Sequence, residues 1–113
     1  MYDAIIIGGG PGGLTAGIYA ARANMKTLLI RSTFKASLIT TTDIIENYPG
    51  FPEGIGGFEL VERFTEQALR FGVIIMDDDI LSVVKTSVDG KGQISHEGLF
   101  AQRGVNIPLI RSF

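Results

Sequence analysis

The sequence predicts an α/β fold that is built on a parallel β-sheet. Three observations support this prediction. An apolar segment at residues 2–7 runs directly into the glycine-rich run GGGPGG at residues 8–13, residues 14–23 continue with the apolar spacing of a helix, and residues 27–30 form a second apolar segment. Strand, helix and strand within about 30 residues make a βαβ unit, whose strands are parallel and whose crossover is right-handed.

The first strand and helix each have a local reason in the sequence. Residues 2–7 are apolar on both faces, which is typical of a strand in the centre of a parallel sheet. The helix carries Leu14, Ile18 and Ala21 on one side. It is predicted to end near Asn24, because asparagine tolerates the left-handed backbone conformation of helix ends.

A second amphipathic helix is predicted after a long irregular segment at residues 32–57. It runs from about Phe58 to Phe71 and ends at Gly72. Glu59 and Arg63 are spaced to form an ion pair on its solvent side. Its apolar face is formed by Val61, Phe64, Ala68 and Phe71.

Shorter strands are predicted after this helix. Residues 73–76 form a short apolar strand. Residues 80–85 and 92–96 flank Asp89-Gly90, a dipeptide typical of β-hairpin turns. Residues 99–102 are a further candidate strand.

Length and composition limit the classes to which this protein can belong. Its 113 residues suit a single domain, and 45% hydrophobic with 19% charged residues is typical of a folded protein. A net charge of -2 without a basic face argues against a nucleic-acid partner, and no apolar run approaches the roughly 20 residues of a membrane span. The chain has no cysteine, and Asp77-Asp78-Asp79 is predicted to be a solvated turn, so no metal site is predicted. We therefore expect a cytoplasmic protein.

The glycine-rich turn has the spacing of a dinucleotide cradle. Gly8 allows a sharp turn, Gly10 lets the backbone approach a pyrophosphate, and Gly13 lets the helix pack close to the strand. Pro11 stands where the helix begins, so its missing N–H costs nothing, and the free amides of the first turn point at the phosphates. With a strand before it and a helix after it, this motif predicts a Rossmann-like nucleotide-binding site.

Several further segments carry a family resemblance. They are residues 2–30, the run Thr40-Thr41-Thr42, the run ENYPGFP at residues 46–52, and residues 66–72. Together they resemble the N-terminal FAD-binding segment of the low-molecular-weight thioredoxin reductases, in the pyridine nucleotide-disulfide oxidoreductase family. The resemblance implies a flavoprotein that passes reducing equivalents from NADPH through FAD to a disulfide. Because relatives of similar pattern reduce other partners, the final acceptor stays open.

The resemblance also implies roles for particular residues. Gly8, Gly10, Pro11 and Gly13 would hold the pyrophosphate of FAD. Thr42 and Asn47 would make polar contacts near the flavin, since both side chains donate and accept hydrogen bonds without adding charge. From the residues alone, Thr42 and Asn47 can equally be turn residues that satisfy nearby backbone groups.

The chain departs from the family pattern at the end of its second strand. These folds often place there an acid that accepts hydrogen bonds from the adenosine ribose, whereas this chain has Arg31, which cannot accept any. A guanidinium group meets a 2′-phosphate through two parallel bonds, so NADP is an alternative ligand of the same pocket. Residues 36–39 read ASLI, where the family commonly has Gly-Gly-Gln-Leu.

These observations lead to one overall expectation. The fold class is α/β, with a partial Rossmann-like (βαβ) FAD-binding domain that has a parallel sheet and a C-terminal β-hairpin. Residues 1–113 form a single incomplete domain, in which residues 1–80 match the family and residues 81–113 are unassigned. A partial domain of this kind exposes a sheet edge, so we expect self-association or a missing second domain.

Two functions from different classes are open. In the first, the chain is the FAD-binding part of a thioredoxin-reductase-like flavoprotein oxidoreductase. Such a chain is not competent alone for disulfide reduction, because it lacks a Cys-x-x-Cys pair and an NADPH domain, and no catalytic residue is assigned in it. In the second, the chain is a non-catalytic nucleotide-binding remnant or an NADP-binding module that uses Arg31.

Overall fold

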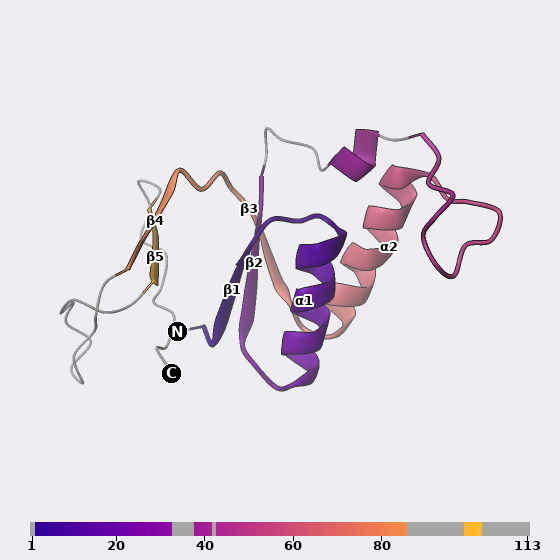
Figure 1. Cartoon of the computed structure of the whole chain (residues 1–113). Helices are drawn as coiled ribbons and strands as arrows, with labels where there is room; N and C mark the ends of the chain where they lie inside the picture. The colour runs from indigo at the N-terminus through magenta and orange to yellow at the C-terminus, as the bar shows by residue number, and fades with distance from the viewer. Residues whose placement is uncertain (1, 33–37, 42, 86–98, 103–113) are drawn as a thin grey trace.

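The computed structural model describes residues 2–32, 38–41, 43–85 and 99–102 of the chain. Its main sheet is parallel, and two helices connect the strands on the same side of it (Figure 1). In chain order the elements of this unit are β1 (Ala4–Ile7), α1 (Pro11–Arg22), β2 (Thr27–Arg31), α2 (Gly57–Arg70) and β3 (Ile74–Asp77). The predicted α/β class, the parallel βαβ unit and both helices are confirmed.

Strand β2, and not β1, lies in the centre of this sheet. The strand order is β1-β2-β3, and Leu28, Leu29 and Ile30 of β2 are at most 3% exposed, whereas Ile7 at the end of β1 is 50% exposed. The prediction that residues 2–7 form the central strand is therefore wrong for the described sheet. Apolar character on both faces indicates burial, but it does not determine which strands become neighbours.

Helix α1 begins and ends as its sequence predicts. Pro11 is its first residue and Gly10 is its N-cap. Asn24, just beyond its C-terminus, has a φ of 60°. The side chains of Leu14 and Ile18 are buried against Leu29 of β2 and Val73, in a core cluster that also includes residues of α2.

Helix α2 buries one face against α1 and the sheet. Val61 and Ala68 are buried as predicted, and Phe64 is partly buried against the same cluster. Leu60, which the sequence reading did not place on the apolar face, is 0% exposed, because it packs against the loop that precedes the helix. The helix therefore has a broader apolar face than its sequence predicts.

The C-terminal end of α2 agrees with the prediction at Gly72 and differs from it at Phe71. Gly72 has a φ of 90° and follows the helix directly, as expected of a residue that stops it. Phe71 was expected in the core but is 38% exposed, because it already lies outside the helix. Its ring stands 5.8 Å from the guanidinium carbons of both Arg22 and Arg70.

The segment between β2 and α2 contains a short 3-10 helix, η1 (Leu38–Thr41), and an ordered loop. Ile45 and Ile55 form an antiparallel bridge that closes this loop, with backbone hydrogen bonds of 2.8 and 3.0 Å. Both side chains are buried with Leu60, and Tyr48 and Phe51 pack against them. The loop is thus attached to α2 by an apolar cluster of its own.

The last described strands form a separate antiparallel ribbon, β4 (Ser82–Lys85) and β5 (Leu99–Gln102). Figure 1 shows this ribbon on the side of the main sheet away from the helices. The candidate strand at residues 99–102 is confirmed. The predicted partner of β4, residues 92–96, lies outside the described residues, as does the turn at Asp89-Gly90, and the described partner is Leu99–Gln102.

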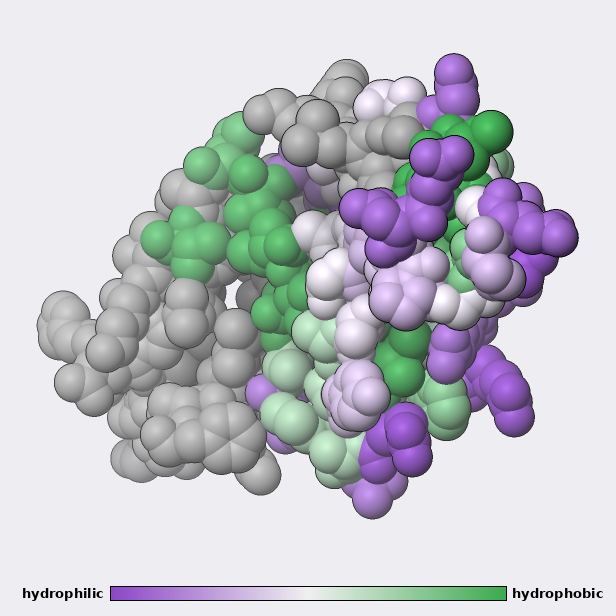
Figure 2. All heavy atoms as spheres, turned by 45° about the vertical axis from the view of Figure 1, so that its right-hand side comes forward, coloured by the Kyte–Doolittle hydropathy of each residue, from purple (hydrophilic) through white to green (hydrophobic). Residues whose placement is uncertain are grey.

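On the face drawn in Figure 2, apolar side chains form a column beside the grey atoms, and most hydrophilic side chains lie on the other side of this column. Several large apolar side chains stay exposed, among them Ile7, Tyr19, Phe58, Ile74 and Leu81. Such surface is available for contact with another chain. The expected self-association stays a prediction.

Candidate functional site

The candidate site lies where the parallel strands end and α1 begins. A cavity of about 920 Å³ opens there between the glycine-rich turn, the end of β2 and residues 58–66 of α2. Open α/β sheets bind their ligands at this carboxyl edge of the strands. The cavity is lined by Gly8, Gly9, Gly10, Arg31, Ser32, Thr40, Phe58, Val61, Glu62, Thr65 and Glu66.

The glycine-rich turn is closed by contacts that only glycine permits. Gly8 has a φ of 121°, a conformation that other residues rarely adopt. A Cβ atom on Gly13 would stand 1.9 Å from the carbonyl oxygen of Gly8, so any side chain at this position would push α1 away from the turn. The amide of Gly8 donates to the carbonyl of Ile30 at 2.9 Å, which attaches the turn to β2. The geometry agrees with a sharp turn at Gly8 and close packing at Gly13, and the binding of a pyrophosphate by these residues stays a prediction.

The N-terminus of α1 adjoins this cavity and has no side-chain cap. Gly10 is the N-cap and has no side chain that could bond to the first amides of the helix. Its carbonyl accepts the first bond of the helix, from the amide of Leu14 at 3.0 Å. Because the first amides of a helix lack partners within it and carry the positive end of the helix dipole, this turn attracts an anion such as phosphate.

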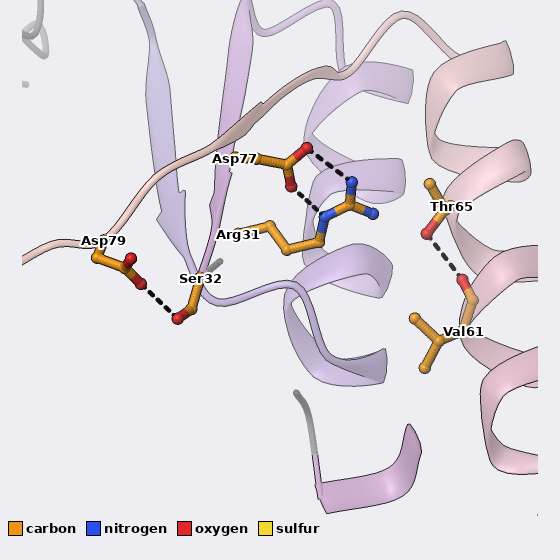
Figure 3. A network of polar contacts seen from close by, with 6 residues as sticks. All are labelled: Arg31, Ser32, Val61, Thr65, Asp77 and Asp79. Carbon is orange, nitrogen blue, oxygen red and sulfur yellow. Dashed lines mark hydrogen bonds and ion pairs between the residues drawn. The ribbon is translucent and has the colours of Figure 1, made fainter. Parts of the chain in front are cut away.

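Arg31 is held beside the turn by an acid from the next strand. Its Nε donates to Oδ1 of Asp77 at 2.6 Å and its Nη2 donates to Oδ2 at 3.0 Å (Figure 3). The hydrogen bond to Asp77 raises the pKa of Arg31, and the same bond lowers the pKa of Asp77. The pair is partly solvated, with 38% and 54% of the two side chains exposed.

Backbone register and a second side-chain contact position this ion pair. Arg31 and Asp77 are directly opposite in the parallel pairing of β2 and β3, and the amide of Asp78 donates to the carbonyl of Arg31 at 2.8 Å. The hydroxyl of Ser32 donates to Asp79, again across the same two strand ends (Figure 3). The expectation of a solvated turn at residues 77–79 is wrong for Asp77, which belongs to β3 and is ion-paired.

The far wall of the cavity comes from α2 and was not predicted from the sequence. Phe58, Val61, Glu62, Thr65 and Glu66 of its first turns line the cavity. The hydroxyl of Thr65 donates to the carbonyl of Val61 at 2.8 Å, as Figure 3 shows. The sequence offers only a weak signal for such a wall. A helix that follows a parallel strand begins near the carboxyl edge of the sheet, so the acidic residues of its first turns can reach a site at that edge.

One of the predicted site residues, Asn47, does not line the described cavity. Asn47 is exposed in the loop at residues 46–52, which surrounds a separate hollow of about 310 Å³. Thr42 lies outside the described residues, and its neighbour Thr40 lines the main cavity. The structure thus groups Gly8, Gly10 and Arg31 in one cavity, with Pro11 and Gly13 in the adjoining turn of α1.

The described residues contain no group of three or more His, Cys, Asp or Glu side chains that could hold a metal ion. Within the same residues, no helix has the length and apolar character needed to cross a membrane.

Comparison with known proteins places the chain in a family. A sequence model of the pyridine nucleotide-disulphide oxidoreductases matches residues 2–102. The chain belongs to this family. The thioredoxin reductase of Mycolicibacterium smegmatis is 51% identical over an alignment of 96 residues, and the match covers 80% of this chain and 30% of that protein. The bifunctional thioredoxin reductase/thioredoxin of Mycobacterium leprae (strain TN) is 46% identical over an alignment of 99 residues, and the match covers 82% of this chain and 21% of that protein.

Solved structures of family members share the fold. The thioredoxin reductase from Giardia duodenalis superimposes with a TM-score of 0.72 and 33% identity, over 86% of this chain and 33% of that one. The atypical thioredoxin reductase from Desulfovibrio vulgaris Hildenborough gives a TM-score of 0.68 and 36% identity, over 85% of this chain and 34% of that one. The resemblance to thioredoxin reductases seen in the sequence is confirmed, and the chain spans about a third or less of the length of these relatives.

Proposed function

We propose that this chain forms the FAD-binding part of a thioredoxin-reductase-like flavoprotein oxidoreductase. The closed glycine turn is the observation that carries the proposal. Gly13 packs so tightly on Gly8 that a Cβ atom cannot be accommodated, and Gly10, the N-cap of α1, lines the cavity. A tight turn that ends in free amides fits a pyrophosphate, which needs close backbone approach and positive charge.

The residues present fit the adenosine and pyrophosphate portion of such a ligand. Gly8 and Gly10 line the cavity and would accommodate the phosphates, and Pro11 sets the direction of the first helical turn. When bound, the flavin supplies the carrier that accepts and releases electrons. This chain's own residues bind and orient that group, and none of its described side chains is assigned a catalytic step.

Retention of flavin tests the proposal directly. The purified full chain is incubated with FAD, desalted and examined by visible absorbance. We expect a retained flavin band in the wild-type protein and its loss in Gly10→Val, because a branched side chain there obstructs approach of the phosphates to the amides. Gly56→Val is the matched control, since Gly56 is also an extended helix N-cap but does not line the cavity.

The outcomes separate the two open functions. Flavin retained equally by the wild type and Gly10→Val would contradict the assignment of the cradle. A colourless wild-type protein that is stabilised by adenine nucleotides would instead support a nucleotide-binding module without flavin. Thermal stability detects such binding well, because a ligand at about 100 times its dissociation constant adds roughly 2.7 kcal/mol.

A further inference from the structure

We propose that the groove between the C-terminal ends of α1 and α2 binds an acidic segment of a partner protein. The segment inserts an apolar side chain between Tyr19 and Phe71, and its carboxylates meet Arg22 and Arg70. No residue that lines this groove also lines the cavity beside the glycine-rich turn. The proposal therefore adds a protein partner and does not depend on the nucleotide-binding function proposed above.

The groove is formed by two helices that lie side by side. Because α1 and α2 each connect parallel strands, they run in the same direction, and their C-terminal ends lie next to each other (Figure 1). A hollow of about 160 Å³ separates them, lined on the core side by Ile18 and Phe64 and on the solvent side by the exposed rings of Tyr19 and Phe71. An apolar cavity of about 150 Å³ holds a molecule of benzene, so this hollow has room for a single apolar side chain.

Two arginines stand at the solvent edge of this groove. Arg22 is the last residue of α1 and lines the groove, and Arg70 is the last residue of α2. The guanidinium carbon of each lies 5.8 Å from the centroid of the Phe71 ring. A cation–π contact of this kind positions a guanidinium group but does not use its N–H donors, which can bond to a carboxylate.

Neither arginine has an acidic partner within the described residues. The ion pairs found there join Arg31 to Asp77 and Arg63 to Glu59. Glu66, one helical turn before Arg70, lines the cavity at the candidate site instead. Basic residues in the last turn of a helix interact favourably with its dipole, which accounts for their position but not for the exposed rings beside them. The groove thus combines uncompensated positive charge with apolar surface.

This combination fits an acidic protein segment. Tyrosine, phenylalanine and arginine are the residue types enriched where proteins bind one another. A carboxylate can bond to a guanidinium group through two parallel hydrogen bonds, and an apolar side chain in the hollow removes ring surface from water. The whole chain carries a net charge of -2, so an acidic ligand is attracted by the local arrangement of Arg22 and Arg70 and not by the overall charge.

Three short peptides with blocked ends test the proposal. EELEE carries both carboxylates and an apolar side chain, EESEE lacks the apolar side chain, and KKLKK reverses the charge. In an NMR titration of the isotope-labelled full chain, we expect EELEE to shift the backbone amide signals of Tyr19, Arg22 and Phe71. The other two peptides should bind at least about fivefold more weakly, because one loses the apolar contact and the other places like charges together.

Variants of the full chain locate the charges that matter. Arg22→Gln and Arg70→Gln should each weaken binding of EELEE about two- to fivefold, the range of an exposed ion pair. Lys26→Gln is the matched control, since it removes the same charge from a residue that stands 5.1 Å from the ring centroid of Tyr2 and does not line the groove. It should keep the wild-type affinity. All three side chains are exposed, so the variants should fold as the wild type does.

Each outcome supports or overturns the proposal. It is overturned if EELEE leaves the signals of Tyr19, Arg22 and Phe71 unmoved, or if either of the other peptides binds as tightly. An equal loss of affinity in Lys26→Gln and Arg22→Gln would show attraction by overall charge and exclude the groove as the site. If the same amide signals shift with protein concentration in the absence of peptide, a second copy of the chain occupies the groove and the acidic partner is excluded. None of these outcomes affects flavin retention, which tests the proposed function separately.

Discussion

Replacing Gly13 by alanine should destabilise the protein through a single backbone contact. The added Cβ atom would stand 1.9 Å from the carbonyl oxygen and 3.0 Å from the carbonyl carbon of Gly8. Carbon and oxygen atoms repel strongly well before this distance, so α1 would have to move by about 1 Å or more relative to the turn. Neither opposing atom belongs to a side chain, so rotamer changes cannot relieve the clash.

The size of the effect follows from two opposing contributions. Forcing a group into a packed site typically costs about 1–3 kcal/mol, and a rigid backbone contact belongs near the upper end of that range. Alanine regains about 1 kcal/mol over glycine through its helix propensity. We therefore expect Gly13→Ala to lower the free energy of unfolding by about 2 kcal/mol.

Gly12→Ala provides the matched control from the next position in the chain. Gly12 is exposed and lies in the same helical turn, and a Cβ atom there would meet no other atom within 4 Å. Its variant should be as stable as the wild type or up to about 1 kcal/mol more stable. Urea unfolding measures both changes, provided that the free energy of unfolding falls with urea concentration at the same slope in all the variants. A Gly13→Ala protein as stable as Gly12→Ala would refute the close packing of the turn.

Two further predictions concern the core and the ion pair. Leu60→Ala should lower the free energy of unfolding by about 2–5 kcal/mol, because the Leu60 side chain is 0% exposed. Leu69→Ala should lower it by less than about 1 kcal/mol, because Leu69 is 53% exposed. Equal losses for the two variants in urea unfolding would contradict the assigned core. The Arg31–Asp77 pair should contribute about 0.2–1 kcal/mol, a small value because the pair is partly solvated. Since the pKa of Asp77 is lowered by folding, this contribution is complete above the ordinary aspartate value of 3.8 and is lost as the pH falls through the lowered pKa. The stability difference between wild type and Asp77→Asn should therefore be constant from neutral pH to about pH 5 and shrink in stronger acid, whereas a difference that grows in acid would contradict the pairing.

Gly13 and Arg31 differ in how much of their role the sequence predicts. The role of Gly13 follows from local geometry, since a strand, a tight turn and a helix leave room for glycine only at fixed spacings. The role of Arg31 depends on its partner. Nothing near Arg31 in the chain indicates that Asp77 neutralises it, because the two residues meet only when β3 pairs with β2.

The strand order and the residues that line the cavity also could not be predicted from short segments of the sequence. The apolar pattern of residues 2–7 predicts burial, but β2 became the central strand because the chain returns through α2 to place β3 on its other side. The same return brings Glu62 and Glu66 to the cavity. Leu60 is buried against Ile45 and Ile55, which form the bridge in the preceding loop. Loop residues have no regular spacing of apolar side chains, so the sequence pattern does not predict this contact.

The sequence by itself determined the features that depend on neighbouring residues. These are the βαβ unit, the start of α1 at Pro11, the stop of α2 at Gly72, and the glycines that permit a pyrophosphate cradle. Only the tertiary structure decided which charged side chains lie beside that turn. The physical reason is that backbone conformation is set by local sterics, whereas the electrostatic environment of a site is set by side chains that folding brings from distant segments.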